Sequence, residues 1–214
     1  MFGFLKRYTH WLHAQWPAGT VEKLPEVCDD GSTEVSGLYV VGDLTGIPLL
    51  KFSSDTGARV VRSFVADVSF QKRKKQDGVH DLVIVGGGVS GMAAALEAQK
   101  NGLNFVLLEA SERFSTVVNF PKGKPIYTYP TEMVPAGDLQ FSDDADVKER
   151  LLEELEARTK DIDVVIGRAE YVEKTGDCLR VVVSDGEEIQ AHRVVVAIGR
   201  SGNFRKLDVP GEDL

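Results

Sequence analysis

The sequence has few cysteines, no long apolar run and no excess of positive charge. Its two cysteines, Cys28 and Cys178, lie far apart and form no C-x-x-C pair, so we predict neither a disulfide framework nor a dithiol redox centre, and a reducing cytoplasm fits best. A net charge of −8 argues against nucleic acid as a partner. No apolar run is long enough for a signal peptide or a membrane span, so we expect neither export nor a membrane partner.

Two local features depart from this ordinary background. The basic run at residues 71–76 predicts a solvated linker, with a nucleic-acid or membrane patch as the alternative. Residues 1–18 carry aromatic and leucine side chains at helical spacing before Pro17, which predicts an amphipathic helix. It would pack on its own domain, on a partner or on a membrane surface. His10 and His13 lie there without a third ligand, so no metal site is predicted.

Apolar periodicity predicts an α/β fold with a central parallel sheet. A chain of 214 residues with 43% hydrophobic residues can bury a substantial core. Strands are predicted at 38–41, 82–85, 104–108 and 193–198, and helices at 47–65, 90–100 and 145–159. Short strands at 164–166, 169–173, 178–183 and 188–191 predict a small antiparallel meander. Residues 110–142 are predicted to be irregular.

A glycine turn follows the strand at 82–85 and opens the next helix. It contains Gly86, Gly88, Val89, Ser90 and Gly91. Such a turn lets the backbone approach a pyrophosphate, and the helix N-terminus presents free N–H groups to it. Because a glycine string alone is weak evidence, the strand before it and the helix after it carry the prediction of dinucleotide binding.

Glu109 ends the next predicted strand, and Ala110 follows it. A carboxylate at this place can accept hydrogen bonds from both hydroxyls of an adenosine ribose and would repel a 2′-phosphate. The site therefore favours FAD or NAD over NADP, and Glu109 alone does not distinguish the first two.

Three motifs together resemble the two-dinucleotide-binding-domain flavoproteins, especially thioredoxin reductases and related pyridine nucleotide-dependent oxidoreductases. They are the glycine turn with Glu109, the strand that ends in Ala197 and Gly199 with Leu207–Gly211 beyond it, and the segment Thr33–Asp43 followed by a helix. The resemblance implies a Rossmann-like FAD-binding domain that takes part in oxidoreductase chemistry with a nicotinamide cofactor.

The resemblance also implies roles for single residues. Gly42 and Asp43 would lie against the ribityl and pyrophosphate side of FAD, and Leu49 and Leu50 would bring a helix N-terminus to the flavin pyrimidine. Asn119 would be a polar contact of the flavin, and the backbone of Ala169 would meet the adenine. A turn or cap aspartate, an ordinary loop asparagine and an ordinary strand alanine are the alternatives for Asp43, Asn119 and Ala169.

The chain departs from the family pattern in three ways. It has no C-x-x-C, no second glycine fingerprint, and the Thr33–Asp43 motif precedes the glycine turn although its family counterpart comes last. We therefore expect a circularly permuted FAD domain over 19–214, built from segments 19–68 and 79–214 joined by a linker at 69–78. A linker of about 10 residues can span roughly 30 Å.

These departures leave the function of the whole protein open. We expect the chain to be part of a longer protein or complex whose NAD(P)H-binding domain or subunit lies elsewhere. The alternatives are an NAD-binding dehydrogenase domain and a non-catalytic FAD-binding or interaction module. No side chain is predicted to be catalytic.

Overall fold

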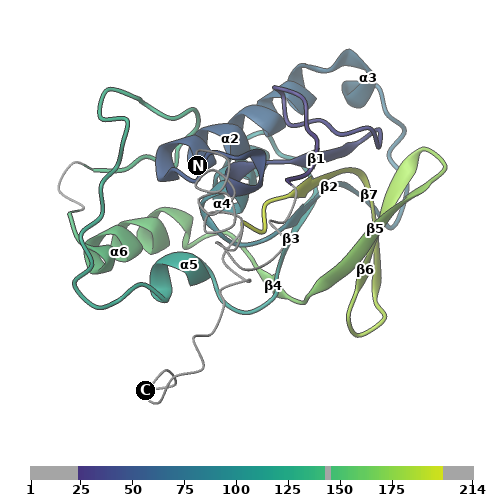
Figure 1. Ribbon diagram of the computed structural model, residues 1–214. Coiled ribbons are helices and arrows are strands. Elements are labelled where there is room, and N and C mark those ends of the chain that lie inside the picture. Colours follow the sequence, from purple (N-terminus) through teal and green to yellow (C-terminus); the bar gives the residue numbers. More distant parts are fainter. Residues whose placement is uncertain (1–23, 143–145, 200–214) are drawn as a thin grey trace, which may run out of the picture.

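The computed structural model describes residues 24–142 and 146–199 (Figure 1). The predicted helix at 1–18 and the motif Leu207–Gly211 lie outside the described residues. The strands are β1 (Leu38–Val40), β2 (Val79–Val85), β3 (Phe105–Glu109), β4 (Val165–Ile166), β5 (Ala169–Thr175), β6 (Cys178–Val183) and β7 (Glu188–Val196). The helices are the 3₁₀ turn η1 (Gly42–Thr45) and α2 (Leu50–Ala66), α3 (Val68–Gln71), α4 (Val89–Lys100), α5 (Ser115–Val118) and α6 (Lys148–Thr159).

One sheet contains all seven of these strands in the order β4-β3-β2-β7-β6-β5, and β1 also pairs with β7. The pairs from β4 to β7 are parallel, as is the pair of β1 with β7, whereas β5, β6 and β7 form an antiparallel meander. The predicted α/β fold with a mostly parallel central sheet and a small meander is therefore confirmed.

Strand β7 has two neighbours along one of its edges. Its other edge is taken by β2, from Gln190 to Val196. On the shared edge, β6 pairs with the first half, from Glu188 to Ala191, and β1 pairs with the last three residues, from Val194 to Val196. Because β1 and β2 both pair in parallel with β7 as far as Val196, their carboxyl ends lie at the same end of the sheet.

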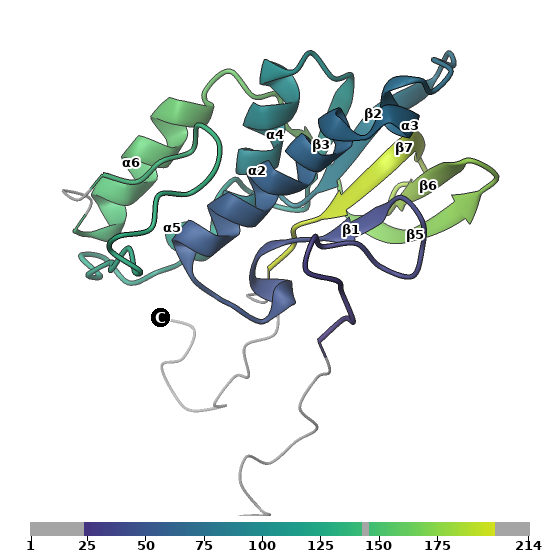
Figure 2. The same cartoon turned by 90° about the horizontal axis from the view of Figure 1, so that it is seen from above.

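Two hydrophobic clusters hold the layers together. Helices α2, α4 and α6 lie side by side over one face of the sheet (Figure 2). The cluster beneath them joins Val61 and Phe64 of α2 with Ile84 of β2 and Met92 of α4. The second cluster, on the other face, packs side chains of the meander against β2, β3 and β7. Residues on both sides of segment 69–78 thus share one core.

The structure corrects two strand predictions. The strands predicted at 188–191 and 193–198 are one strand, β7, because no turn residue separates them and His192 is buried within it. The strand predicted at 164–166 does not belong to the meander, since β4 pairs in parallel with β3. Helix α6 lies between β3 and β4, and such a crossover returns the chain in the parallel direction.

Two helix boundaries differ from prediction, and the connecting segment makes specific contacts with the domain. Helix α2 begins at Leu50 rather than 47 because Leu49 is extended, and α6 begins at Lys148 rather than 145. The basic run at 71–76, predicted to be a solvated linker, is exposed except for the half-buried Arg73. Phe70 is buried, and Arg73 stacks on its ring and donates to the Asp81 carboxylate at 2.9 Å. The segment is therefore anchored to the start of β2.

Candidate functional site

The predicted glycine turn connects β2 to α4 with very close packing. A Cβ on Gly91 would lie 1.8 Å from the carbonyl oxygen of Gly86, so only glycine lets the helix approach the strand this closely. Gly88 occupies the N-cap position of α4, and no side chain caps this end. Among the described residues, a Cβ on Gly88 would have no neighbour within 4 Å. The backbone amides of Val89 and Ser90, which are the first two of α4, are therefore accessible to an anion that approaches past Gly88.

Glu109 lies next to this turn, as its position at the end of β3 requires. Its carboxylate is buried and accepts hydrogen bonds from the Gly87 amide at 2.6 Å and the Ser111 amide at 2.9 Å. Ala110 follows on the exposed side. The carboxylate of a residue fixed beside the glycine turn can receive ribose hydroxyls when the adjoining turn holds a pyrophosphate.

The Thr33–Asp43 segment reaches the same place from the other end of the chain. The Val41 amide donates to the Val196 carbonyl at 3.0 Å and continues the pairing of β1 with β7. Gly42 then lies against Ser90, because a Cβ on Gly42 would be 2.1 Å from the Ser90 hydroxyl oxygen. Asp43 follows in η1, and its carboxylate accepts from the Ser53 hydroxyl at 2.8 Å. The two motifs therefore meet.

Helix α2 provides a second uncapped N-terminus in this region. Leu49 is its N-cap residue and Leu50 its first residue, with no side-chain cap and no acidic residue in the first turn. The helix crosses α4 at Gly57, where a Cβ would lie 2.1 Å from the Ser90 carbonyl oxygen. Both helices with an uncapped N-terminus therefore involve Ser90, because α4 contains this residue and α2 packs against it through Gly57.

The end of β7 completes the arrangement. The Ala197 amide donates to the Val85 carbonyl at 2.7 Å, and the Ala197 carbonyl borders Gly86. Gly199, with a φ of 65°, is the last described residue. The structure therefore brings both ends of the predicted site, Gly86 and Ala197, into direct contact.

Among the described residues, no hydrogen bond joins Asn119 or Ala169 directly to the glycine turn or to Asp43. Asn119 is exposed, and its side-chain amide donates to the Ser115 carbonyl within α5 at 2.8 Å. Ala169 begins β5 and pairs with Val183. It is linked to the site through Gly167, whose amide donates to the Glu109 carbonyl at 2.9 Å.

Several contacts of the site were not foreseen from sequence. The Gly87 amide donates to the Glu109 carboxylate, and the Gly42 amide donates to the Thr56 hydroxyl at 3.1 Å. The Ser53 hydroxyl donates to the Asp43 carboxylate. A glycine inside the helix at position 57 is a signal that could have indicated the tight crossing, since glycine weakens a helix unless packing requires it.

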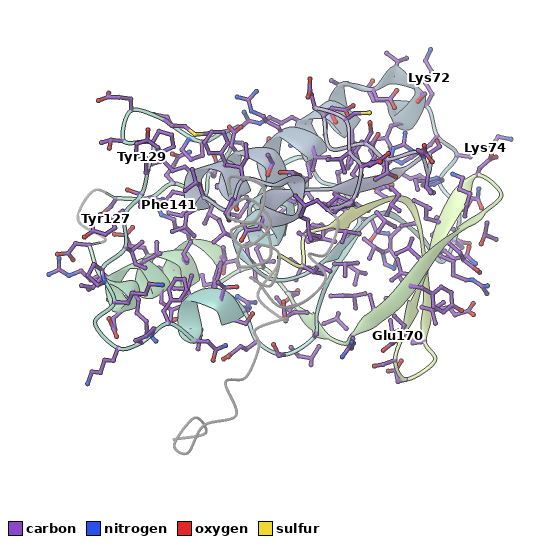
Figure 3. The ribbon with its side chains drawn as sticks, in the orientation of Figure 1. Lys72, Lys74, Tyr127, Tyr129, Phe141 and Glu170 are labelled. Atoms are coloured by element: carbon purple, nitrogen blue, oxygen red, sulfur yellow. The ribbon has the colours of Figure 1, made fainter. Side chains whose placement is uncertain are left out.

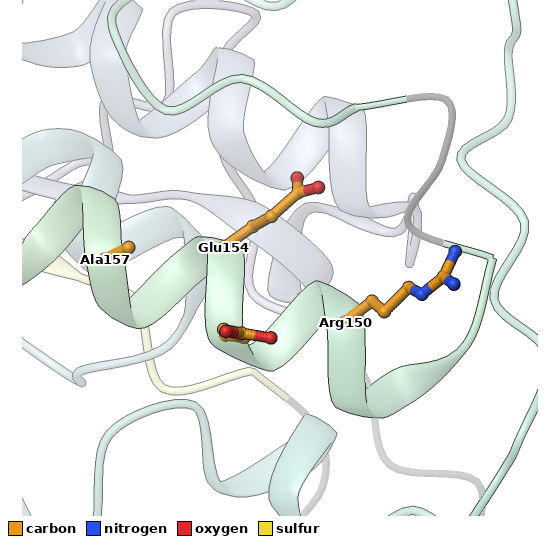
Figure 4. A pocket seen from close by; sticks show the side chains of 4 residues that line it. Arg150, Glu154 and Ala157 are labelled. Carbon is orange, nitrogen blue, oxygen red and sulfur yellow. The ribbon is translucent and has the colours of Figure 1, made fainter.

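Two surface hollows of the described residues lie elsewhere. The larger has a volume of about 430 Å³ and is lined by Arg150, Glu153, Glu154 and Ala157, all on the outer face of α6 (Figure 4). Another, of about 280 Å³, lies beside β3 and β4. Neither includes a residue of the glycine turn. Within the described ranges, no helix is long and apolar enough to cross a bilayer, and no cluster of three metal-ligand side chains occurs.

The mostly parallel sheet, with a glycine turn between β2 and α4, has a Rossmann-like architecture. Residues 80–214 match the family model described as pyridine nucleotide-disulphide oxidoreductase, and the chain belongs to this family. It is a flavoprotein oxidoreductase domain. The match begins at residue 80, so β1, α2 and the Thr33–Asp43 motif precede the matched region.

Individual relatives agree with this assignment. Alkyl hydroperoxide reductase F of Staphylococcus aureus is 30% identical over 135 residues, which cover 63% of this chain and 24% of that protein. Ferredoxin–NADP reductase of Ignicoccus hospitalis is 27% identical, with coverages of 63% and 41%. The solved bacillithiol disulfide reductase of Staphylococcus aureus matches the fold with a TM-score of 0.52 at 19% identity, covering 63% of this chain and 43% of that one. The chain thus spans less than half the length of these proteins.

Proposed function

We propose that this chain is the FAD-binding domain of an oxidoreductase that accepts hydride from a nicotinamide cofactor. The contact of Gly42 with Ser90 carries the proposal, because it joins the Thr33–Asp43 motif to the glycine turn. Two uncapped helix N-termini and one buried carboxylate then surround the place where these motifs meet. This combination suits an extended ligand with a pyrophosphate, a ribose and a second polar end.

Each group of residues would hold one part of the cofactor. The amides of α4 after Gly88, with the close packing at Gly91, would bind the pyrophosphate, and Glu109 with Ala110 would hold the adenosine ribose. Asp43 would accept a hydrogen bond from the ribityl chain. Further contacts would come from Leu49, Leu50, Ala197, Gly199, Asn119 and Ala169.

FAD is favoured over NAD by the second half of the site. Glu109 and the glycine turn suit either dinucleotide equally well. NAD bound at the glycine turn would offer no group to the α2 N-terminus or to Asp43. In contrast, an N-terminus at Leu50 would stabilise negative charge on a flavin pyrimidine. The bound flavin supplies the hydride chemistry, and the protein residues bind it, orient it and adjust its electrostatic surroundings.

We further propose that segments 19–68 and 79–214 form one domain in a permuted order. The pairing of β1 with the end of β7 and the shared core of α2 and α4 support this proposal. Segment 69–78 would be the connection between them. The hydride donor would bind to a NAD(P)H-binding domain or subunit, and the free thiols of Cys28 and Cys178 fit a reducing compartment such as the cytoplasm.

Absorbance spectroscopy of the purified chain tests the cofactor assignment. After incubation with FAD and removal of the excess, we expect a flavin band near about 450 nm. Titration with NADH under the same conditions should show no tight binding. A chain that gains no flavin band, or that binds NADH more tightly than FAD, would contradict the proposal.

A further inference from the structure

Lys51 is a buried cation in the first turn of α2. Its side chain is on a residue only 5% exposed. The ammonium group donates hydrogen bonds to the carbonyl oxygens of Pro130 at 3.1 Å and Thr131 at 2.9 Å. Lysine usually extends its charged end into water, so a lysine held inside by two carbonyls needs a physical explanation.

The described residues provide no carboxylate partner for this charge. No ion pair with Lys51 occurs among them. Asp55, one turn further along α2, pairs with Arg59 at 2.6 Å and accepts the Ala136 amide at 2.8 Å. Asp43 bonds Ser53. Two carbonyl oxygens accept from the three N–H groups of the Lys51 ammonium, but they do not neutralise its charge.

Neighbouring contacts prevent the side chain from moving away. Three neighbouring residues of α2 hold the loop that follows Tyr129. Lys51 donates to the carbonyls of Pro130 and Thr131, and Ser54 donates to the Leu139 carbonyl at 2.7 Å. The Asp55 carboxylate accepts a hydrogen bond from the Ala136 amide. Figure 3 shows Tyr127, Tyr129 and Phe141 together on this side of the molecule, far from Lys72 and Lys74. The charge of Lys51 is therefore fixed near the start of α2.

We propose that Lys51 is a positioning residue that favours the reduced form of the bound flavin. This inference rests on the proposed FAD function. Hydride transfer from a dihydronicotinamide adds two electrons and one proton to the neutral flavin ring and leaves it with one negative charge. Lys51 and the α2 N-terminus have the same positive sign, so both stabilise that charge at the pyrimidine end.

The test compares charge-removing and charge-preserving variants. In Lys51→Gln the amide can still donate to a loop carbonyl, but the charge is lost, whereas Lys51→Arg keeps the charge. Lys100→Gln is the control, because Lys100 lies at the C-terminal end of α4 and its ammonium pairs with the Asp138 carboxylate at 3.0 Å. The midpoint potential of bound FAD is measured in each protein by reduction with dithionite and a reference dye.

We expect Lys51→Gln to weaken binding of reduced FAD relative to oxidised FAD by about tenfold, which lowers the two-electron potential by about 30 mV. Lys51→Arg should largely restore the potential, and Lys100→Gln should leave it unchanged. A flavin-bound Lys51→Gln protein with an unaltered potential would refute the role of Lys51 alone. Wild-type protein that binds no FAD would instead refute the proposed function and this inference with it.

Lys51→Met is a second charge-removing variant for the case in which Lys51→Gln does not fold, because its side chain is also unbranched. We expect it to lower the potential in the same direction as Lys51→Gln. A flavin-bound Lys51→Met protein with an unaltered potential would overturn the proposal.

Discussion

Gly57 of α2 faces the carbonyl oxygen of Ser90 in α4 without room for a side chain. A Cβ at this position would lie 2.1 Å from that oxygen. Ser90 also meets Gly42, so the beginning of α4 is enclosed by two parts of the segment that precedes residue 69. This contact links the stability of the α2–α4 pair to the geometry of the glycine turn.

Substituting Gly57→Ala should therefore destabilise the fold. The obstructing atom is a backbone carbonyl, which cannot rotate away as a side chain could, so α2 must shift from α4. We expect the free energy of unfolding to fall by about 1–3 kcal/mol, the usual cost of overpacking. Urea unfolding followed by circular dichroism measures it. An alanine protein as stable as wild type would show that the two helices do not cross this closely.

Gly88→Ala, unlike Gly57→Ala, should weaken FAD binding and leave the free energy of unfolding almost unchanged. Its backbone has a φ of −79°, and a Cβ there would meet no atom of the described part of the chain within 4 Å. The unliganded protein should therefore keep its stability within about 0.5 kcal/mol. The methyl group would occupy the approach of a pyrophosphate to α4. We expect the Kd for FAD to rise at least about tenfold, measured by quenching of FAD fluorescence. Unchanged affinity would place the pyrophosphate elsewhere.

Glu109→Gln tests the ribose contact. The carboxylate already accepts the Gly87 and Ser111 amides, and a neutral amide replaces one acceptor oxygen with a donor. Hydrogen bonds to charged groups contribute about 1.5–3 kcal/mol, so the Kd for FAD should rise roughly ten- to a hundredfold by isothermal titration calorimetry. Glu112→Gln, at an exposed position three residues later, is the control and should bind FAD as wild type does.

The local parts of the site could be predicted from sequence. The strand, the glycine turn and Glu109 follow one another along the chain, and each has a distinctive composition: a β-branched run, closely spaced glycines and one acidic residue after the next strand. Their order favours β2 and β3 as neighbours, because two parallel strands joined by a crossover helix are usually adjacent. Strands β1 and β2 are also joined by a helix, but β7 lies between them.

The remaining parts depend on contacts between distant residues. Lys51 reaches Pro130 across 79 positions, and Asp55 reaches Ala136 across 81. No local pattern specifies such pairs, because a lysine or an aspartate on a helix has the same propensity whether it faces water or a loop. The meeting of Gly42 with Ser90 was expected only through the family resemblance, which indicated that both motifs serve one ligand.

The opposite end of the sheet should make stability depend on pH. His192 of β7 is buried, and this burial, followed by the positive charge of Arg73, lowers its pKa below the ordinary value of 6.5. The unfolded chain therefore binds a proton more readily than the folded protein as the pH falls below about 6.5. The stability that comes from a neutral His192 is present above that pH and is lost toward the lower folded pKa.

We expect the free energy of unfolding to decrease from about pH 7 to about pH 5.5, by less than about 1.4 kcal/mol per pH unit. Urea unfolding across this range measures the slope. The carboxylate of Asp81 cannot cause it. Burial raises its pKa, but the Asn104 amide and Arg73 outweigh that effect, so the pKa lies below the usual 3.8 and its contribution is lost only in stronger acid.

His192→Gln should remove this slope, since the glutamine side chain does not titrate. It can lower stability at every pH, because the imidazole lies 3.9 Å from the Cys178 sulfur in a closely packed place, but the curve should become flat between about pH 7 and 5.5. His80→Gln, which removes a histidine that bonds Asn104 at the start of β2, is the control and should retain the slope. If the slope persists in His192→Gln and disappears in His80→Gln, then the proton uptake on unfolding belongs to His80, and the burial of His192 has no effect on stability.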